Sequence, residues 1–206
     1  MQAVFFDLDG TLYNKKGLAK RIVADALLRG RLSEGGSWRP ISCLRLLMLE
    51  RSERRRLASV DTGTVGYDTL FEAISRRCAF SVDAVRSWYD GWYMKTMVSE
   101  LEAHYSLDAE VMRQAEEFKA QGVKLAVLSD YGCVESKLRA IGGSPEFFDA
   151  LLDAPSLGGF KPASGVFRAA CQVLGVDPAE CEMFGDRPDT DGGCVSVGMK
   201  FVLIQR

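Results

Sequence analysis

Apolar and polar positions follow two different patterns along this chain. Four short apolar runs have the length and composition of strands buried on both faces of a parallel sheet. They span residues 3–6, 123–128, 182–184 and 200–204, and a weaker fifth run covers 147–152. Between these runs, apolar side chains recur at helical spacing over residues 107–121, 133–141 and 163–174. The alternation predicts an α/β fold in which helices cover both faces of a parallel sheet.

Residues 15–105 interrupt that alternation. Their apolar positions, such as Leu18, Ile22 and Ala26, are spaced as on helices and lie among basic residues, and Pro40 breaks the pattern. This predicts a helical module inserted between the first strand and the rest of the sheet. We therefore expect a core of residues 1–14 and 106–206 and a helical insertion of residues 15–105.

The charge of the chain is nearly balanced but unevenly distributed. Its 206 residues include 26 Lys and Arg and 28 Asp and Glu, a net charge of −2. This balance gives no reason to expect nucleic acid or an anionic membrane as a partner. Residues 15–60, however, hold 12 basic and 4 acidic residues, a net charge of +8, whereas the remainder has a net charge of −10.

The N-terminal residues, the length of the apolar runs and the cysteine content together predict a cytoplasmic protein. The residues before Asp7 show neither the basic segment nor the long apolar stretch of a signal peptide, and no apolar run approaches the about 18 residues of a membrane span. The six cysteines form no C-x-x-C pair, and the single histidine, His104, is not expected to act in catalysis. These counts disfavour a zinc site and favour reduced thiols.

Polar residues follow the predicted strands at the points where the strands end. Ligands of an open α/β sheet bind at the carboxyl ends of its strands, so these residues are the first candidates for a functional site. They are Asp7, Asp9, Gly10 and Thr11, then Ser129 and Asp130, then Lys161 before the last predicted helix, and finally Gly185, Asp186, Asp189 and Asp191. We expect carboxylates, one hydroxyl and one ammonium to converge at one edge of the sheet.

Such a cluster of carboxylates indicates a cation. Neighbouring carboxylates repel one another unless a cation lies among them, and an all-oxygen set without His or Cys suits Mg²⁺. Magnesium held by few carboxylates leaves positions for phosphate oxygens, to which a lysine and a hydroxyl supply charge and hydrogen bonds. The set therefore favours phosphoryl transfer, with one carboxylate as nucleophile and another as acid and base. Asp7 and Asp9 could divide those roles.

Four segments of the chain resemble, in order, the four motifs of the haloacid dehalogenase superfamily. The first is Phe5-Phe6-Asp7-Leu8-Asp9-Gly10-Thr11-Leu12, and the second is Leu125-Ala126-Val127-Leu128-Ser129. The third is Gly159-Phe160-Lys161-Pro162, and the fourth is Gly185-Asp186-Arg187-Pro188-Asp189-Thr190-Asp191. The resemblance covers the chain from end to end. It departs from the pattern at Asp130, where many relatives have Asn.

The resemblance implies a Rossmann-like core and a role for each matching residue. Asp7 would be the nucleophile and a Mg²⁺ ligand, and Asp9 would be the general acid and base, with its main-chain carbonyl also reaching the metal. Asp186 would ligate Mg²⁺, and Asp191 would support it. The phosphate would be bound by Thr11, Ser129, Asp130 and Lys161.

The position of the insertion places the chain within the superfamily. An insertion directly after the first motif resembles the helical cap of one subclass, and the 31 residues between Ser129 and Lys161 leave no room for a second large cap. The resemblance implies a Mg²⁺-dependent phosphatase that hydrolyses a small phosphorylated metabolite through an aspartyl-phosphate. Two alternatives are a phosphomutase using the same aspartate and a non-catalytic regulatory protein. Dehalogenation is disfavoured because dehalogenases of this type lack the second aspartate, here Asp9. No pattern indicates an oligomeric state.

Three residues near the predicted site have simpler interpretations. Asp130 is expected to cap the helix that begins near Cys133 rather than to act in catalysis. Cys133 is expected to be a small packing residue, not a nucleophile. Asp189 either contacts the waters of the metal or forms a turn after Pro188.

Two clusters in the insertion also have two interpretations each. Trp88, Tyr89, Trp92 and Tyr93 are expected to form the core of the insertion, with contact to substrate as the alternative. The basic cluster from Arg51 to Arg56 is either a solvated helix face or a positive surface that attracts an anionic substrate.

Overall fold

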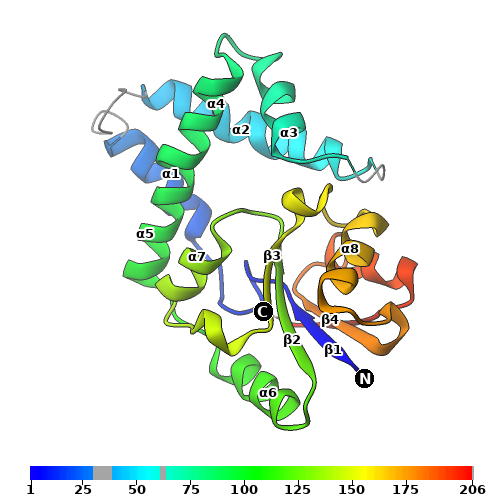
Figure 1. Ribbon diagram of the computed structural model, residues 1–206. Helices are drawn as coiled ribbons and strands as arrows, with labels where there is room; N and C mark the ends of the chain where they lie inside the picture. The colour runs from blue at the N-terminus through cyan, green and yellow to red at the C-terminus, as the bar shows by residue number, and fades with distance from the viewer. Residues whose placement is uncertain (30–38, 61–63, 206) are drawn as a thin grey trace.

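A five-stranded parallel sheet forms the centre of the protein, whose computed structural model describes residues 1–29, 39–60 and 64–205 (Figure 1). The spatial order of its strands is β3-β2-β1-β4-β5. In chain order they are β1 (Ala3–Phe6), β2 (Lys124–Ser129), β3 (Ala150–Asp153), β4 (Cys181–Gly185) and β5 (Lys200–Leu203). Each of the five apolar runs overlaps one of these strands, so the α/β fold predicted from the sequence is confirmed. The central strand β1 places Phe6 beside Val127 and Phe184, which brings three strand ends together.

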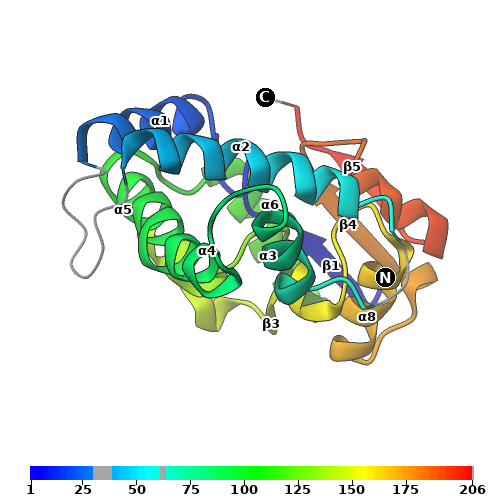
Figure 2. The ribbon, with the colours of Figure 1, turned by 90° about the horizontal axis from the view of Figure 1, so that it is seen from above.

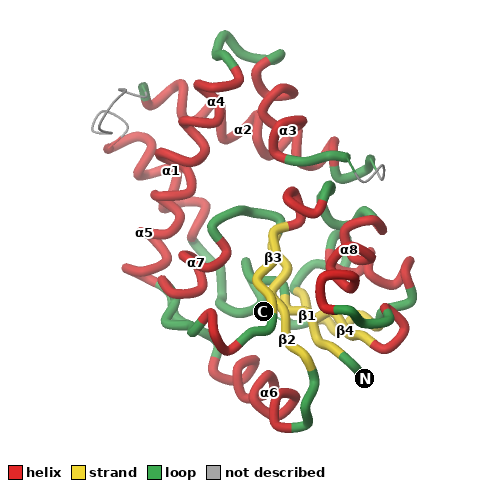
Figure 3. Tube along the Cα trace, in the orientation of Figure 1, coloured by secondary structure: helices red, strands yellow, loops and turns green. Residues whose placement is uncertain are grey.

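The two faces of the sheet are covered by different helices, because successive side chains of a strand point to opposite faces. Val4 and Phe6 belong to a core shared with α6 (Ala109–Ala120) and α7 (Val134–Ala140). Ala3 and Phe5 belong to a second core shared with α8 (Ser164–Leu174) and the 3₁₀ segment η5 (Asp191–Val197). Figure 3 shows these helices around the strands. The three helices predicted in the second half of the chain are therefore present.

The weakest predicted strand, 147–152, begins later than its apolar pattern indicates. A 3₁₀ turn, η2 (Pro145–Phe147), precedes it, and β3 starts only at Ala150. Asp149 accounts for the delay, since its carboxylate accepts a hydrogen bond from the backbone N–H of Leu125 at 2.7 Å. Aromatic side chains in a turn resembled the start of a strand.

Residues 15–105 contribute helices and no strand in their described part. These are α1 (Leu18–Arg29), α2 (Pro40–Leu57), α3 (Tyr67–Ser75), α4 (Val82–Trp88), the π-helical turn η1 (Tyr89–Met94) and α5 (Lys95–His104). In Figure 1 α2, α3 and α4 lie above the carboxyl ends of the strands, and α5 descends beside α7, against which it packs. Figure 2 shows from above how α2 extends from α1 toward the side of β4. The helical insertion therefore covers the edge of the sheet where the candidate residues lie.

Aromatic side chains form the centre of this insertion. Trp88 is fully buried and stacks on Trp92 and Tyr93, with ring centroids 6.0 and 5.3 Å away. Residues five apart share a face where the helix widens to a π-turn, so η1 brings Tyr93 beneath Trp88. The interpretation of these residues as a packed core is confirmed, and Tyr93 additionally lines the cavity described below.

Within residues 1–29, 39–60 and 64–205, no helix has both the length and the apolar character that crossing a bilayer requires.

Close packing of η5 against the loop that carries Lys161 fixes two candidate residues relative to each other. A β-carbon added at Gly193 lies 2.4 Å from the Pro162 side chain and 2.5 Å from its backbone oxygen. One added at the neighbouring Gly192 meets only Phe201, at 3.7 Å, which is an ordinary contact. The absence of a side chain at Gly193 is what lets Asp191, at the start of η5, approach Lys161.

We predict that Gly193→Ala destabilises the protein by about 1–3 kcal/mol, the range typical of overpacking, because the added methyl group displaces the Lys161–Pro162 backbone. The free energy of unfolding in urea measures this effect. Gly192→Ala is the matched control and should change it by less than about 0.5 kcal/mol. Equal effects of the two substitutions would show that the contact with Pro162 does not limit the packing.

Candidate active site

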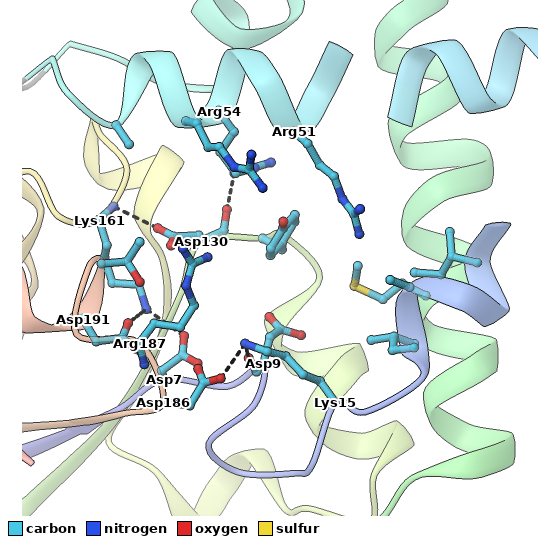
Figure 4. A pocket seen from close by; sticks show the side chains of 18 of the residues that line it. Asp7, Asp9, Lys15, Arg51, Arg54, Asp130, Lys161, Asp186, Arg187 and Asp191 are labelled. Carbon is cyan, nitrogen blue, oxygen red and sulfur yellow. Dashed lines mark hydrogen bonds and ion pairs between the residues drawn. The ribbon is translucent and has the colours of Figure 1, made fainter. Parts of the chain in front are cut away.

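The candidate residues meet at the carboxyl edge of the sheet because β1, β2 and β4 end side by side. Asp7 directly follows β1, and its backbone N–H continues the ladder by donating to the Phe184 carbonyl at 2.9 Å. Ser129 is the last residue of β2, and Asp186 directly follows β4. Figure 4 shows Asp7, Asp9, Asp186, Asp191 and Lys161 gathered at this edge. Parallel pairing of three strands thus produces the convergence that the sequence predicts.

Lys161 connects two of these carboxylates from within the protein. Its ammonium lies 2.7 Å from Asp7 Oδ1 and 2.6 Å from Asp191 Oδ1, and it donates to the Leu128 carbonyl at 3.2 Å. The side chain is 1% exposed. Burial alone would lower the pKa of Lys161, but the charges of Asp7 and Asp191 raise it well above its ordinary value, so the ammonium stays protonated.

Asp7 has an unusual titration because it is removed from water at the base of a cavity. Burial raises its pKa to about 6, and the neighbouring charges of Asp191 and Asp9 add to this effect against the opposing charge of Lys161. The carboxyl group is therefore ionised at neutral pH but costs free energy in that form. A further cation beside it would favour the ionised form.

Asp9, two residues after Asp7, has surroundings that shift its pKa in the opposite direction. Tyr13 donates to its Oδ1 at 2.6 Å, while Lys137 and Ser129 donate to its Oδ2 at 2.6 and 3.0 Å. Burial by itself would raise the pKa of Asp9, but the charge of Lys137 and these hydrogen bonds lower it below the ordinary value. In the described arrangement Asp9 is a carboxylate with both oxygens held.

Lys137 and Tyr13 were not among the residues predicted from the sequence. Lys137 is fully buried on α7, on the face that carries the buried Leu138 and Val134. A lysine within an apolar helix face is a detectable signal, since lysine is almost never fully buried without a partner. Tyr13 has the weaker signal of lying four residues after Asp9.

Asp186 and Lys15 form the outer part of the site. The Lys15 ammonium lies 2.7 Å from Asp186 Oδ2 and donates to the main-chain carbonyl of Asp9, also at 2.7 Å. Asp186 Oδ1 is buried and has no hydrogen-bond partner among the described residues. Gly10, with φ +114°, makes room here, because a β-carbon would lie 2.5 Å from Asp186 Oδ2. Lys15, like Lys137, was missed by sequence reasoning.

The site offers a suitable set of ligands for a hard cation. Asp7, Asp186 and Asp191 each present a carboxylate oxygen, and these three atoms lie within 4.8 Å of one another. The orphaned Oδ1 of Asp186 adds a second, independent reason, because a buried oxygen without a donor is costly unless a ligand satisfies it. Oxygen-only donors suit Mg²⁺ or Ca²⁺ better than zinc or copper.

Three predicted phosphate-binding residues take different positions around the site. Asp130 lines the cavity, and its carboxylate accepts a hydrogen bond from the backbone N–H of Lys161 at 2.9 Å. The hydroxyl of Thr11 is buried behind Asp7, 3.5 Å from its Oδ2, and Ser129 contacts Asp9. Neither Thr11 nor Ser129 lines the cavity.

The interpretations of three residues near the site have different outcomes. Asp130 does not cap α7, since its carboxylate is used by Lys161, and the helix begins after Cys133 without a side-chain cap. Cys133 is exposed, in a left-handed conformation with φ 55°, so its interpretation as a packing residue is wrong. Asp189 lies in a turn directly after Pro188, which confirms one of its two interpretations. Its exposed carboxylate accepts a hydrogen bond from Arg187 Nε at 3.1 Å.

Arg54 contradicts the interpretation of the basic cluster as a wholly solvated face. Its guanidinium is buried, pairs with the buried Glu50 one turn earlier on α2, and donates to the Asp130 carbonyl. It also lies 4.3 Å from the centroid of the Tyr131 ring. These contacts join α2 to the loop after β2, so Arg54 fixes the insertion to the core.

The insertion and the core enclose a cavity of about 430 Å³ between them. Its base carries the carboxylates and Lys161, and its upper side carries arginines of α2, as Figure 4 shows. Apolar residues of α1 and α5 line one wall, among them Leu18, Ile22 and Met97. The cavity is large enough for a small organic molecule.

Comparisons with known proteins show which family the chain belongs to. A family model described as haloacid dehalogenase-like hydrolase matches residues 1–192. N-acylneuraminate-9-phosphatase of Rattus norvegicus is 27% identical over 205 residues, which cover 97% of this chain and 80% of that protein. The chloroplastic protein SUPPRESSOR OF QUENCHING 1 of Arabidopsis thaliana is 27% identical over 188 residues, 90% of this chain but only 16% of that protein's length.

A solved structure shares the fold over the whole chain. The HAD phosphatase from Thermococcus onnurineus superposes with a TM-score of 0.66 at 22% identity, covering 100% of this chain and 87% of that one. At this level of identity the likeness concerns the fold. It includes the helical insertion, since the full length of this chain is aligned.

The raised pKa of Asp7 makes stability depend on pH in a defined direction. Its folded pKa of about 6 exceeds the ordinary value of 3.8, so the stabilisation is present at low pH and is lost as pH rises through 6. We predict that metal-free protein loses up to about 3 kcal/mol of stability from this group between pH 4 and pH 7.5. Asp7→Asn should lack that loss. Urea unfolding of both proteins with a chelator measures it, and parallel pH profiles would contradict the prediction.

Proposed function

The chain belongs to the haloacid dehalogenase-like hydrolases, and on this basis we propose that it is a Mg²⁺-dependent phosphatase acting on small phosphate monoesters. The observation that carries the proposal is the buried Asp7 carboxylate, held by Lys161 at the base of a cavity, with Asp9 two residues away. A nucleophile with an acid and base beside it is what phosphoryl transfer through an acyl phosphate requires. The 27% identity to a protein named N-acylneuraminate-9-phosphatase supports the same activity.

In the first half-reaction, an oxygen of Asp7 attacks the phosphorus of the ester, and the bond from phosphorus to the ester oxygen breaks. Asp7 then carries the phosphoryl group, and the leaving alkoxide takes a proton from Asp9. The Lys161 ammonium, 2.7 Å from Asp7 Oδ1, orients the nucleophile and offsets negative charge that gathers around the phosphoryl group.

In the second half-reaction, Asp9 accepts a proton from water as the water oxygen attacks phosphorus. The bond from phosphorus to Asp7 breaks, which regenerates the carboxylate and releases inorganic phosphate. The lowered pKa of Asp9 suits this step, because the group is then ionised. To protonate the leaving oxygen beforehand, Asp9 must bind a proton and loosen its contact with Lys137.

The three carboxylates with clustered ligand atoms, Asp7, Asp186 and Asp191, would hold Mg²⁺, together with the main-chain carbonyl of Asp9. When bound, the cation supplies positive charge to the phosphate oxygens and stabilises ionised Asp7. We further propose that residues 15–105 act as a cap, because α2 closes the cavity from above and Arg54 ties it to the loop after β2.

Substitution of the two central aspartates tests the mechanism. We predict that Asp7→Asn abolishes hydrolysis of p-nitrophenyl phosphate, and that Asp9→Asn lowers kcat by about 10²–10⁴-fold, the usual contribution of acid and base catalysis. Asp189→Asn, on an exposed residue outside the cavity, is the matched control and should retain activity. Turnover by Asp7→Asn at the wild-type rate would refute Asp7 as nucleophile.

Lys15 provides a test of the metal site that does not depend on turnover. Its ammonium contacts Asp186 and the Asp9 carbonyl, two groups proposed to bind Mg²⁺, and therefore competes with the cation. We predict that Lys15→Met tightens Mg²⁺ binding by roughly tenfold, or about 1.4 kcal/mol, in isothermal titration calorimetry. Lys16→Met removes an exposed lysine beside it and serves as the control. Unchanged or weaker binding in Lys15→Met would place the cation elsewhere.

A further inference from the structure

The upper side of the cavity is formed by one face of α2. Arg51, Arg54 and Arg55 lie three and four residues apart, which places them on the same side of the helix, and all three line the cavity. Figure 4 shows Arg51 and Arg54 extending from α2 toward the carboxylates and Lys15 below. Arg54 has partners in Glu50 and the Asp130 carbonyl. Among the described residues, the guanidinium groups of Arg51 and Arg55 have no ion-pair or hydrogen-bond partner.

The other cations around the cavity are already paired with carboxylates. Lys15 contacts Asp186, and Lys161 contacts both Asp7 and Asp191. Arg187 pairs with the exposed Asp189, and the buried Lys137 behind the site pairs with Asp9. Within the described parts of the chain, this leaves the guanidinium groups of Arg51 and Arg55 as the cavity's cations without an anion.

The position of Arg51 beside the cavity is set by its helix, α2, which is anchored within one turn of this residue. The buried Glu50–Arg54 pair and the contact of Arg54 with the Asp130 carbonyl hold α2 against the loop after β2. An exposed arginine at position 51 is thereby presented to the cavity by a rigid element. Leu18, Ile22 and Met97 give the same cavity an apolar lining.

We propose that Arg51, with Arg55 beside it, forms a subsite for a second anionic group of the substrate. This inference rests on the proposed phosphatase function and specifies its substrate class. The substrate would be a phosphate monoester that carries a carboxylate or another phosphate at the end remote from the phosphate that is hydrolysed, with an uncharged segment between them. Arginine suits this role because its planar guanidinium binds carboxylate or phosphate oxygens in pairs.

A series of matched esters tests the subsite. Alkyl phosphates with a terminal carboxylate, with chain lengths from two to about six carbons, are compared with alkyl phosphates of the same lengths, and bisphosphates of the same lengths form a third arm. We expect kcat/KM for the doubly anionic esters to exceed that of the plain esters by at least about tenfold at one chain length, as for a charged hydrogen bond. The two anionic arms show whether a carboxylate or a phosphate fits the subsite.

Reversing the charge at Arg51 tests whether the substrate preference comes from a contact with this side chain or from the overall positive charge of α2. Arg51→Glu should abolish the preference for the carboxylate and favour alkyl phosphates with a terminal amine instead. Arg45→Glu makes the same change in charge on the same helix, at an exposed residue outside the cavity that donates to the Arg77 carbonyl. It should leave the preference as in the wild type, because Arg45 does not line the cavity and salt screens the interactions of exposed charges.

The outcomes distinguish the subsite from the proposed function. Hydrolysis of the plain esters without any preference for the doubly anionic ones overturns the subsite and leaves the phosphatase function intact. An equal loss of preference in Arg51→Glu and Arg45→Glu also overturns it. No hydrolysis of any ester, with or without Mg²⁺, refutes the proposed function itself. A preference that only Arg51→Glu reverses supports the subsite.

Discussion

The buried ammonium of Lys161 is the interaction on which the rest of this site depends. It lies between Asp7 and Asp191 at 2.7 and 2.6 Å and is nearly inaccessible to water. Two carboxylates this close would repel each other strongly in a medium of low dielectric constant, and the ammonium between them offsets that repulsion. Its position depends on packing elsewhere, since the loop of Lys161 approaches η5 only because Gly193 has no side chain. The fold thus holds a cluster of charges that the local sequence alone could not assemble.

A second buried lysine gives the two aspartates of the first motif different properties. Burial raises the pKa of Asp7 to about 6 despite the opposing charge of Lys161. At Asp9 the balance is reversed, because Lys137, Tyr13 and Ser129 lower the pKa below its ordinary value. Pairs of carboxylates with environments that move their pKa values apart are a basis for dividing catalytic roles. In the proposed mechanism this difference gives Asp7 the phosphoryl group and Asp9 the proton. The cap contributes separately, through arginines that face the same cavity from above.

The sequence was sufficient for the strands, the helices and the order of the motif-like segments, because these depend on local periodicity and on residues next to strand ends. It was insufficient where a side chain finds its partner through tertiary packing. Lys15 and Arg54 look like surface residues in the sequence, yet each contacts the site, whereas Lys137 stands out by its place on an apolar helix face. Arg54 in particular stands in a run of three arginines, and only packing of α2 on the Asp130 loop separates it from its exposed neighbours Arg55 and Arg56. The one local feature that indicates its ion pair is Glu50, which lies four residues earlier on the same helix.

The central claim is that Asp7 accepts the phosphoryl group, and direct trapping of that acyl phosphate tests it best. The protein would be mixed with p-nitrophenyl phosphate and Mg²⁺, quenched in acid within the first turnover, digested, and analysed by mass spectrometry. The account predicts a peptide that contains Asp7 and is heavier by one phosphoryl group, and treatment of the quenched protein with borohydride should reduce that aspartyl-phosphate to homoserine at position 7. A phosphoryl group found on another residue, or turnover with rapid-quench kinetics that exclude any covalent intermediate, would contradict it.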